Sequence, residues 1–322
     1  MGQGEEVKTR PEPKVEIQEK GEIFFFYRPK VGKDEAKSED DVQRMYIVLR
    51  LESGERSIEE KQSSVSGKEG EKLSEEHGDE EGGDKSPDSG SKGGHSSEEV
   101  NIEKQSLLRF IVMGRKSLPD PSQRSRPYWG FVELVTTKIE DVKVALKGEE
   151  YDTATRGHRH KPPARALAEG VYRILRHQSG RRTHTHLIYK LEFLPSDSDS
   201  REPQESLNVE QEGSFLIQIK NPNQQQGGSG GGFRGLQRKR KAAFPAHLQA
   251  QLGKSRFSPA DPPNFLNYEG CEFLLISASD DIEEELGLEL KTECEADPKC
   301  SDLVQMFGET ASSKPLLSGT WV

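Results

Sequence analysis

The sequence predicts an α+β protein rich in β-structure: a mainly antiparallel or barrel-like sheet with a few short helices and a long disordered acidic insertion. Three observations support this class. Short runs of aromatic and β-branched residues, typical of strands, recur along the chain. No helix long enough for a parallel βαβ crossover separates them, which favours antiparallel neighbours. Residues 53–105 contain almost no aromatic or aliphatic side chains.

The run at 22–27 holds four aromatics in six residues, which fits a strand buried on both faces. A polar segment at 178–183, between two apolar runs, indicates a β-hairpin. Helical spacing at 139–146, ended by Gly148, predicts a short helix. The other expected strands span 45–51, 107–113, 128–135, 171–176, 186–193, 214–220 and 272–277. Further helices are expected at 164–168, at 238–252 with a break near Pro245, and from Asp280 onward.

We expect one domain at 21–280, preceded by a flexible segment at 1–20 and followed by an acidic helix and flexible tail at 281–322. Only 31% of the 322 residues are hydrophobic, while 32% are charged. Residues 53–105 cannot bury enough apolar area to offset an ordering entropy of about 1–2 kcal/mol per residue, so we interpret them as a disordered insertion. The Gly- and Gln-rich residues 223–235 predict a linker.

The net charge of −10 is unevenly distributed, because residues 53–100 hold 14 acids and 6 bases. The three cysteines, Cys271, Cys294 and Cys300, form no dense framework, which favours a reducing compartment. The N-terminus lacks the apolar core of a secretory signal, and no run approaches the roughly 18 apolar residues of a membrane span. We therefore expect a cytoplasmic or nuclear protein, and the bases at 238–241 fit a short nuclear-import cluster.

Several blocks resemble a family of uncharacterised plant proteins that has more compact bacterial relatives. They include GEIFFFYRPKVG, RFIVMGRKSLPD, YWGFVELV and YDTATRGHRHKPPARALAEGVYRILRH. The resemblance covers residues 20–280 approximately and implies one continuous domain with an insertion. No established activity, cofactor or catalytic residue comes with that family, so the resemblance implies no site.

Two basic runs are the leading candidates for a binding surface. Residues 156–182 hold eight bases and one acid, Glu169, while residues 234–256 hold seven bases and no acid. Such runs create a positive field, and guanidinium groups fit phosphate or carboxylate. The alternative is solvated strand faces that the acidic insertion balances or screens. The candidate anion-binding residues are Arg156, Arg159, Lys161, Arg165, Arg173, Arg176, Arg181, Arg182, Arg238, Lys239, Arg240 and Lys241.

Two His-x-His pairs, His158/His160 and His184/His186, lie in the same part of the chain. On a strand, residues i and i+2 share a face, so each pair could hold a metal or act in acid–base chemistry. Neighbouring arginines would repel a divalent cation, and polar hairpin residues are the competing interpretation. No metal site is assigned, and the cofactor stays unknown.

We expect a non-enzymatic binding or interaction protein that uses the basic hairpin surface for an anionic ligand, nucleic acid or protein partner. The alternative is an enzyme that acts on an anionic substrate through the histidines, which requires both pairs to converge in one cleft.

Two short motifs lie outside the basic runs. Residues 128–134 match the later part of an RNA-binding strand motif, but Pro127 and Tyr128 stand where a base and a glycine are expected, so we assign these aromatics to the core. The sequence Thr320-Trp321-Val322 fits a PDZ-type ligand that binds by strand addition.

Overall fold

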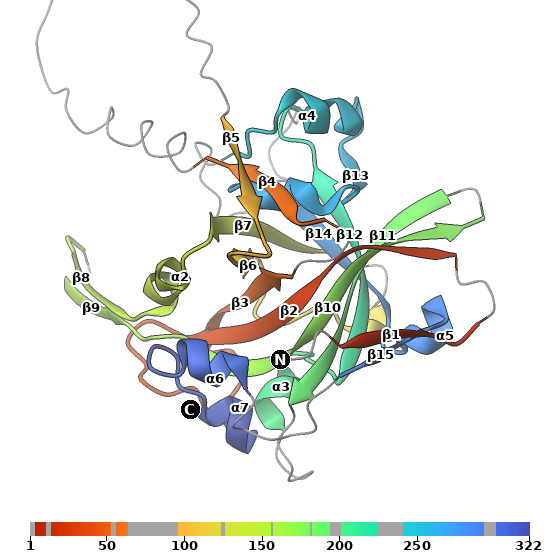
Figure 1. Ribbon diagram of the computed structural model, residues 1–322. Coiled ribbons are helices and arrows are strands. Elements are labelled where there is room, and N and C mark those ends of the chain that lie inside the picture. The colour runs from red at the N-terminus through yellow and green to blue at the C-terminus, as the bar shows by residue number, and fades with distance from the viewer. Residues whose placement is uncertain are drawn as a thin grey trace, which may run out of the picture.

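The computed structural model describes residues 4–10, 14–52, 56–63, 96–123, 126–155, 157–180, 182–193, 201–224, 241–292 and 301–322. Among these residues, eight antiparallel strands form a barrel (Figure 1) in the order β11-β10-β2-β3-β6-β7-β14-β12. Strand β12 pairs back onto β11, and this pairing closes the ring. The strands are β2 (Val15–Pro29), β3 (Val42–Leu51), β6 (Leu107–Met113), β7 (Tyr128–Thr136), β10 (Arg165–Ser179), β11 (Arg182–Phe193), β12 (Glu212–Lys220) and β14 (Glu272–Ser279). The predicted β-rich, antiparallel, barrel-like class is confirmed.

Shorter elements surround the barrel. A ninth strand, β13 (Phe257–Pro259), pairs with β12. Three two-stranded sheets are β1 (Glu5–Lys8) with β15 (Leu288–Lys291), β4 (Ile58–Gln62) with β5 (Ser97–Asn101), and β8 (Glu149–Thr153) with β9 (Gly157–Lys161). The helices are α2 (Ile139–Leu146), α3 (Glu202–Ser206), α4 (Ala246–Leu252), α5 (Ile282–Leu286), α6 (Asp302–Phe307) and α7 (Lys314–Ser318), with 3-10 turns η1 (Glu39–Asp41), η2 (Pro121–Gln123) and η3 (Pro263–Asn267).

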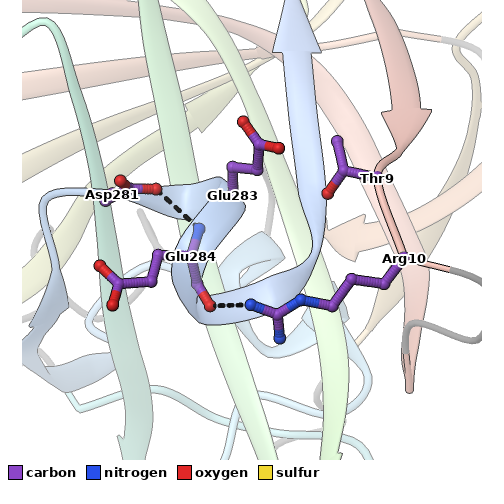
Figure 2. A pocket seen from close by; sticks show the side chains of 5 residues that line it. All are labelled: Thr9, Arg10, Asp281, Glu283 and Glu284. Atoms are coloured by element: carbon purple, nitrogen blue, oxygen red, sulfur yellow. Dashed lines mark hydrogen bonds between the residues drawn. The ribbon is translucent and has the colours of Figure 1, made fainter.

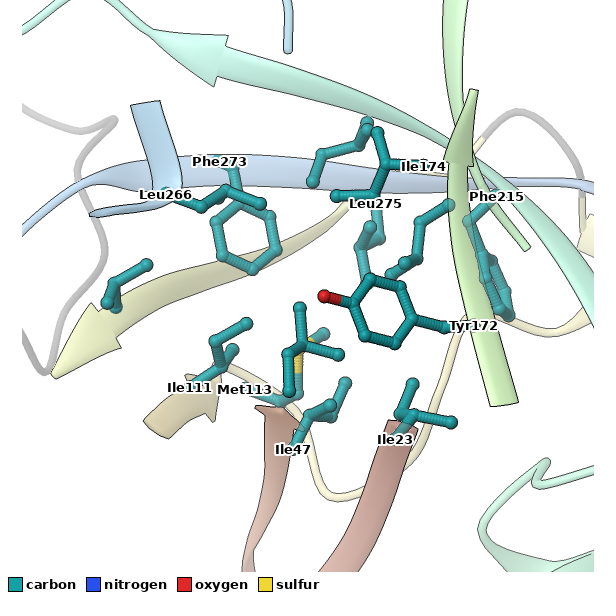
Figure 3. Packing of buried hydrophobic residues seen from close by; sticks show 14 of the residues in the cluster. Ile23, Ile47, Ile111, Met113, Tyr172, Ile174, Phe215, Leu266, Phe273 and Leu275 are labelled. Carbon is teal, nitrogen blue, oxygen red and sulfur yellow. The ribbon is translucent and has the colours of Figure 1, made fainter. Parts of the chain in front are cut away.

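Side chains fill the interior of the barrel. Alternate residues of a strand point to opposite faces, so Ile23, Phe25 and Tyr27 of β2 face inward. Figure 3 shows Ile23, Ile47, Ile111 and Leu275 meeting around the ring of Tyr172. An eight-stranded barrel is just wide enough for such side chains to close-pack.

Two further apolar clusters cover parts of the outer surface. Phe24 and Phe26 face outward on β2 and pack against Phe307 of α6 with edge-to-face geometry. Helices α2, α6 and α7 thereby cover the outside of β2, β3, β6 and β7. On the far side, α5 and β15 cover Leu175 of β10 and Ile188 of β11. These helices are short, and their stability comes from packing on the barrel rather than from length.

A buried polar network lies at one end of the interior. Arg109 of β6 has no exposed surface and binds both carboxylate oxygens of Glu19 at 2.5 and 2.8 Å. The Tyr172 hydroxyl donates to Glu19 at 2.8 Å, and Arg109 Nε donates to Asn267 of η3 at 2.8 Å. Asn267 also donates to Glu59 of β4 at 3.2 Å. The β4–β5 hairpin and η3 therefore close this end of the barrel with satisfied polar groups.

This closure differs from the sequence prediction of continuous disorder over 53–105. Residues 58–62 and 97–101 form the β4–β5 hairpin. Its buried residues include Glu59 and Lys61, which are charged and gave no apolar signal. Val100 and Ile102 belong to the main apolar cluster, so they attach the hairpin to the core. Residues 64–95 of the predicted insertion and 225–235 of the predicted linker lie outside the described residues.

Other boundaries also differ. Residues 165–168 belong to strand β10 and not to a helix, because they pair with the aromatic residues of β2. Part of the predicted flexible N-terminus forms β1, which pairs with β15. Part of the predicted flexible tail forms α6 and α7, whose Phe307 and Leu316 are fully buried. None of the helices in the described part of the chain has the length and apolar character needed to cross a membrane.

Candidate anion-binding surface

The first basic run is divided between two hairpins that project from the barrel. Arg159 and Lys161 lie on the β8–β9 hairpin, whereas Arg173, Arg176 and Arg182 lie on β10 and β11. Figure 1 places the β8–β9 hairpin and the free end of β10–β11 on opposite sides of the molecule. The run therefore does not form one surface.

The β8–β9 hairpin carries acids beside its bases, and Lys161 Nζ lies 3.6 Å from Glu149. Glu149 lies opposite Lys161 and Asp152 opposite His158 in the strand register. His158 Nδ1 lies 3.3 Å from Asp152, and His160 Nε2 lies 3.5 Å from Asp34. The three acids of β8 outnumber the two Arg and Lys residues of β9, so these two strands carry no net positive charge.

Two candidate arginines are structural. Arg173 is 0% exposed, is ion-paired with Glu6 and donates to the Gly4 carbonyl at 3.0 Å, which fastens β1 to the barrel. Arg165 is buried and donates to the carbonyls of Pro163 and Asp34. Burial lowers the pKa of Arg165. The prediction that these two residues contribute to a surface is wrong, because their guanidinium groups are enclosed by protein.

The far end of β10–β11, residues 175–186, contains no acid and is here called the hairpin tip. Arg182 is exposed, and it shares the outward face of β11 with His184 and His186 because residues i, i+2 and i+4 alternate together. Arg176 is ion-paired with Glu16 and with Asp261. Of the described candidates in the hairpin tip, Arg182 is thus the one that faces solvent without a carboxylate partner.

The hairpin tip also gathers three histidines. His177 lies directly opposite His184, and its ring centroid is 5.3 Å from that of His186. Burial lowers the pKa of His186 to about 3, with smaller contributions from His177 and His184. His186 Nδ1 lies 3.0 Å from the Ser214 hydroxyl. His177, which the sequence analysis did not single out, joins this group through the cross-strand register.

Among the described residues, α5 contacts β12 and η2 contacts β14, but no helix packs on the outward side chains in the middle of these two strands. Leu216 of β12 and Ile276 of β14 lie opposite one another, are partly exposed and belong to none of the three apolar clusters. Leu216 in turn lies opposite His186, so this surface continues from the hairpin tip. We call the outward residues of β12, β13 and β14, together with Trp129 of β7, the open face.

Aromatic rings and cations meet on the open face. Trp129 and Phe257 have ring centroids 5.7 Å apart. Lys220 Nζ lies 5.4 Å from the Trp129 ring centroid, and the Arg256 guanidinium lies 5.2 Å from that of Phe257. Lys220 is ion-paired with Glu272, whereas Arg256 is exposed. Sequence analysis assigned Trp129 to the core, but its alternating position on β7 points it outward.

The second basic run therefore reaches the open face through its last residues. Lys254 and Arg256 immediately precede β13 and are exposed. Lys241 is also exposed. The remaining bases of that run, Arg234, Arg238, Lys239 and Arg240, lie outside the described residues, as do Arg156 and Arg181 of the first run.

A separate polar pocket of about 310 Å³ lies between β1 and α5 (Figure 2). Asp281 accepts from the Glu284 amide at 2.7 Å and thereby caps α5, while Arg10 donates to the Glu284 carbonyl. These groups stabilise the ends of the short helix. The pocket is open to solvent, and Asp281 and Arg10 are engaged with the backbone of α5, so it gives no specific ligand geometry.

The histidine pairs do not converge. His158 and His160 lie on β9, whereas His184 and His186 lie on β11. Among the described residues, no group of three or more His, Cys, Asp or Glu side chains is arranged to hold a metal ion. The cleft required by the enzyme alternative is therefore not formed by these four residues.

The C-terminal motif lies against the other end of the barrel. The Trp321 ring packs on Tyr27 with centroids 5.5 Å apart, and the Val322 carbonyl accepts from the Ala36 amide at 3.0 Å. Binding to a PDZ domain by strand addition would require these contacts to break. The PDZ-type ligand stays a prediction.

No family model, curated protein or solved structure matches the chain. The resemblance to a plant family thus stays a prediction, and the geometry carries the functional argument.

Proposed function

We propose that the protein is a non-enzymatic binding protein that holds an anionic ligand or partner on the open face and the adjoining hairpin tip. The observation that carries the proposal is that Arg182 and Arg256 are both exposed, one at each border of the open face. The two arginines come from different basic runs. Strand β12 pairs with both β11 and β13, which brings the two borders to one region of the barrel.

Charge and solvation favour an anion here. Outward positions of β14 and of residues 214–220 on β12 include one acid, Glu272, and Lys220 neutralises it. Residues 241–260 contain no acid. Exposed arginines with no carboxylate partner bind phosphate or carboxylate without first breaking an internal ion pair.

The interior of the barrel favours a surface role. Lipocalin-like barrels of this strand number hold one small ligand when the interior is open. Here Tyr172, Phe215 and Phe273 fill the interior, and the Arg109–Glu19 pair lies at one end of it. Binding therefore requires the outer surface.

The test is a fluorescence or filter-binding titration with RNA, DNA and phosphoinositide vesicles over a range of salt concentrations. Arg182→Glu and Arg256→Glu should each weaken binding about tenfold and reduce its salt dependence, because each removes a phosphate contact. Arg159→Glu on the β8–β9 hairpin is the matched control and should bind as the wild type does. Absence of salt-dependent affinity for all three ligands, or equal weakening by Arg159→Glu, would overturn the proposal.

A further inference from the structure

Trp129 and Phe257 come from strands that are not neighbours. In the sheet order β7-β14-β12-β13, two strands separate them. Adjacent strands lie about 4.8 Å apart, so rings whose centroids are 5.7 Å apart must extend toward one another across β14 and β12. Leu274 lies opposite Trp129, points outward and is only 6% exposed. The two rings thus lie across the sheet surface over Leu274.

The two ring planes are inclined at 57° to each other, so the pair forms an angled aromatic surface at the outside of the protein and each ring presents its own face. Both side chains are partly exposed. Trp129 and Phe257 belong to none of the three apolar clusters, so they are not part of the interior core. Exposed aromatic side chains beside cations are the arrangement on which nucleic-acid bases stack.

Described cations lie beside both rings. Lys220 and Arg256 each lie over one ring, and Lys254 is two residues before Arg256. Glu272 binds Lys220 and keeps it beside Trp129. Arg256 and Lys254 are exposed and can reach phosphates that flank a stacked base. A phosphoinositide headgroup offers phosphates but no aromatic ring, so it would use only half of these features.

We propose that the open face binds single-stranded nucleic acid, with a base stacked on the Trp129 ring and the flanking phosphates bound by Arg256 and Lys254. The inference rests on the proposed anion-binding function and specifies its ligand class. Single strands are favoured over duplexes because base pairing and stacking in a duplex hide the base faces. Recognition by stacking is tolerant of sequence, since every base has a π-face.

The first experiment uses the intrinsic fluorescence of Trp129. The chain has two tryptophans, and the other, Trp321, packs on Tyr27 at the C-terminus. In the full-length Trp321→Phe variant, Trp129 is the single reporter. Titration with oligo(dT) or oligo(U) should quench its emission, and a duplex of the same length should quench it far less. Equal quenching by duplex, or no quenching when either single strand is bound, would overturn the inference.

The second experiment measures affinity. Trp129→Ala should weaken binding of the single strands between about fivefold and 150-fold, whereas Trp129→Phe should keep most of the affinity because it keeps a stacking ring. Urea unfolding of both variants shows whether each still folds. If a folded Trp129→Ala binds single strands as tightly as the wild type, the inference fails.

The two proposals can fail separately. Salt-dependent binding that Arg182→Glu and Arg256→Glu weaken, but that is equally strong for duplex and does not quench Trp129, would support anion binding and overturn single-strand stacking. If salt-dependent binding and the quenching of Trp129 are both absent, both proposals are overturned.

Discussion

Arg109 lies inside the barrel with no exposed surface, and two of its guanidinium nitrogens donate to the two carboxylate oxygens of Glu19, at 2.5 and 2.8 Å. Burial alone would lower the pKa of Arg109, but the charge and hydrogen bonds of Glu19 more than offset this and raise it. Burial, followed by the charge of Glu19, raises the pKa of Glu59. The network joins β2, β6, η3 and β4, so it links the barrel wall to the elements that close its end.

Removing one partner of this pair should be strongly destabilising. Glu19→Gln removes the ion-pair partner of the buried Arg109 guanidinium, and breaking a buried pair in this way costs about 3–5 kcal/mol. The free energy of unfolding, measured with urea, checks the value. Glu140→Gln, which removes the exposed pair of Glu140 with Lys143, is the control and should cost less than about 0.5 kcal/mol. A loss for Glu19→Gln no larger than the control would contradict the assignment.

His186 should make the fold acid-sensitive. Its pKa falls from 6.5 to about 3 on folding, chiefly because of burial, so the unfolded chain binds the extra proton between these values. The free energy of unfolding is therefore unaffected by His186 above about pH 6.5, and it decreases by about 2 kcal/mol by about pH 5. His177, His184, Ser214 and Glu285 surround the ring.

The measurement is urea unfolding of the wild type and His186→Asn at several pH values in this window. Between about pH 6.5 and about pH 5, the variant should lose less stability than the wild type. Parallel curves for the two proteins would mean that another group is responsible.

Glu22 should have the opposite effect on the pH dependence of stability. Burial raises its pKa to about 9, Arg50 opposes this, and a hydrogen bond with Asp302 raises it further. The folded protein therefore binds an extra proton between about pH 4.5 and about pH 9, and stability falls as the pH rises through that window. Arg50 binds both Glu22 and Asp302, so this proton helps to attach α6 to the barrel.

Glu22→Gln replaces the protonated carboxyl with a neutral amide. The free energy of unfolding of this variant should change less with pH than that of the wild type. At about pH 9 it should exceed the wild-type value by at least about 1 kcal/mol. Thermal or urea unfolding at about pH 6 and about pH 9 tests this. Wild-type stability that does not fall between these values would refute it.

Most of the fold could be predicted from the sequence, because the strands of the barrel have clear local sequence patterns. The run at 22–27 and the segments at 107–113 and 214–220 are rich in aromatic and aliphatic residues, and each lies within or matches a strand of the barrel. Closure depends on the pairing of β11 with β12, and no local pattern encodes it. The β4–β5 hairpin was missed because Glu59 is stabilised by Asn264 and Asn267, more than two hundred residues away.

The candidate site was harder to predict from the sequence, because contacts between distant residues decide which candidate side chains face solvent. A count of charges treats Arg173 and Arg182 alike, yet Glu6 and Gly4 enclose the first and solvent surrounds the second. Trp129 and Phe257 meet only because β7, β14, β12 and β13 are consecutive in the sheet. The outward position of Trp129 on an alternating strand was the one local signal that could have indicated an exposed ring.

Cys271 should be chemically inert until the barrel unfolds. The side chain is 0% exposed, and burial raises the pKa of its thiol well above the ordinary value. The thiolate is the reactive form, so both effects suppress its reaction with disulfide reagents. Cys294 and Cys300 lie outside the described residues, and the variant Cys294→Ser/Cys300→Ser isolates Cys271. In this variant, a thiol-reactive chromophore should label the native protein at the rate of unfolding and the urea-unfolded protein at once. Rapid labelling without urea would show that this part of the core is open to solvent.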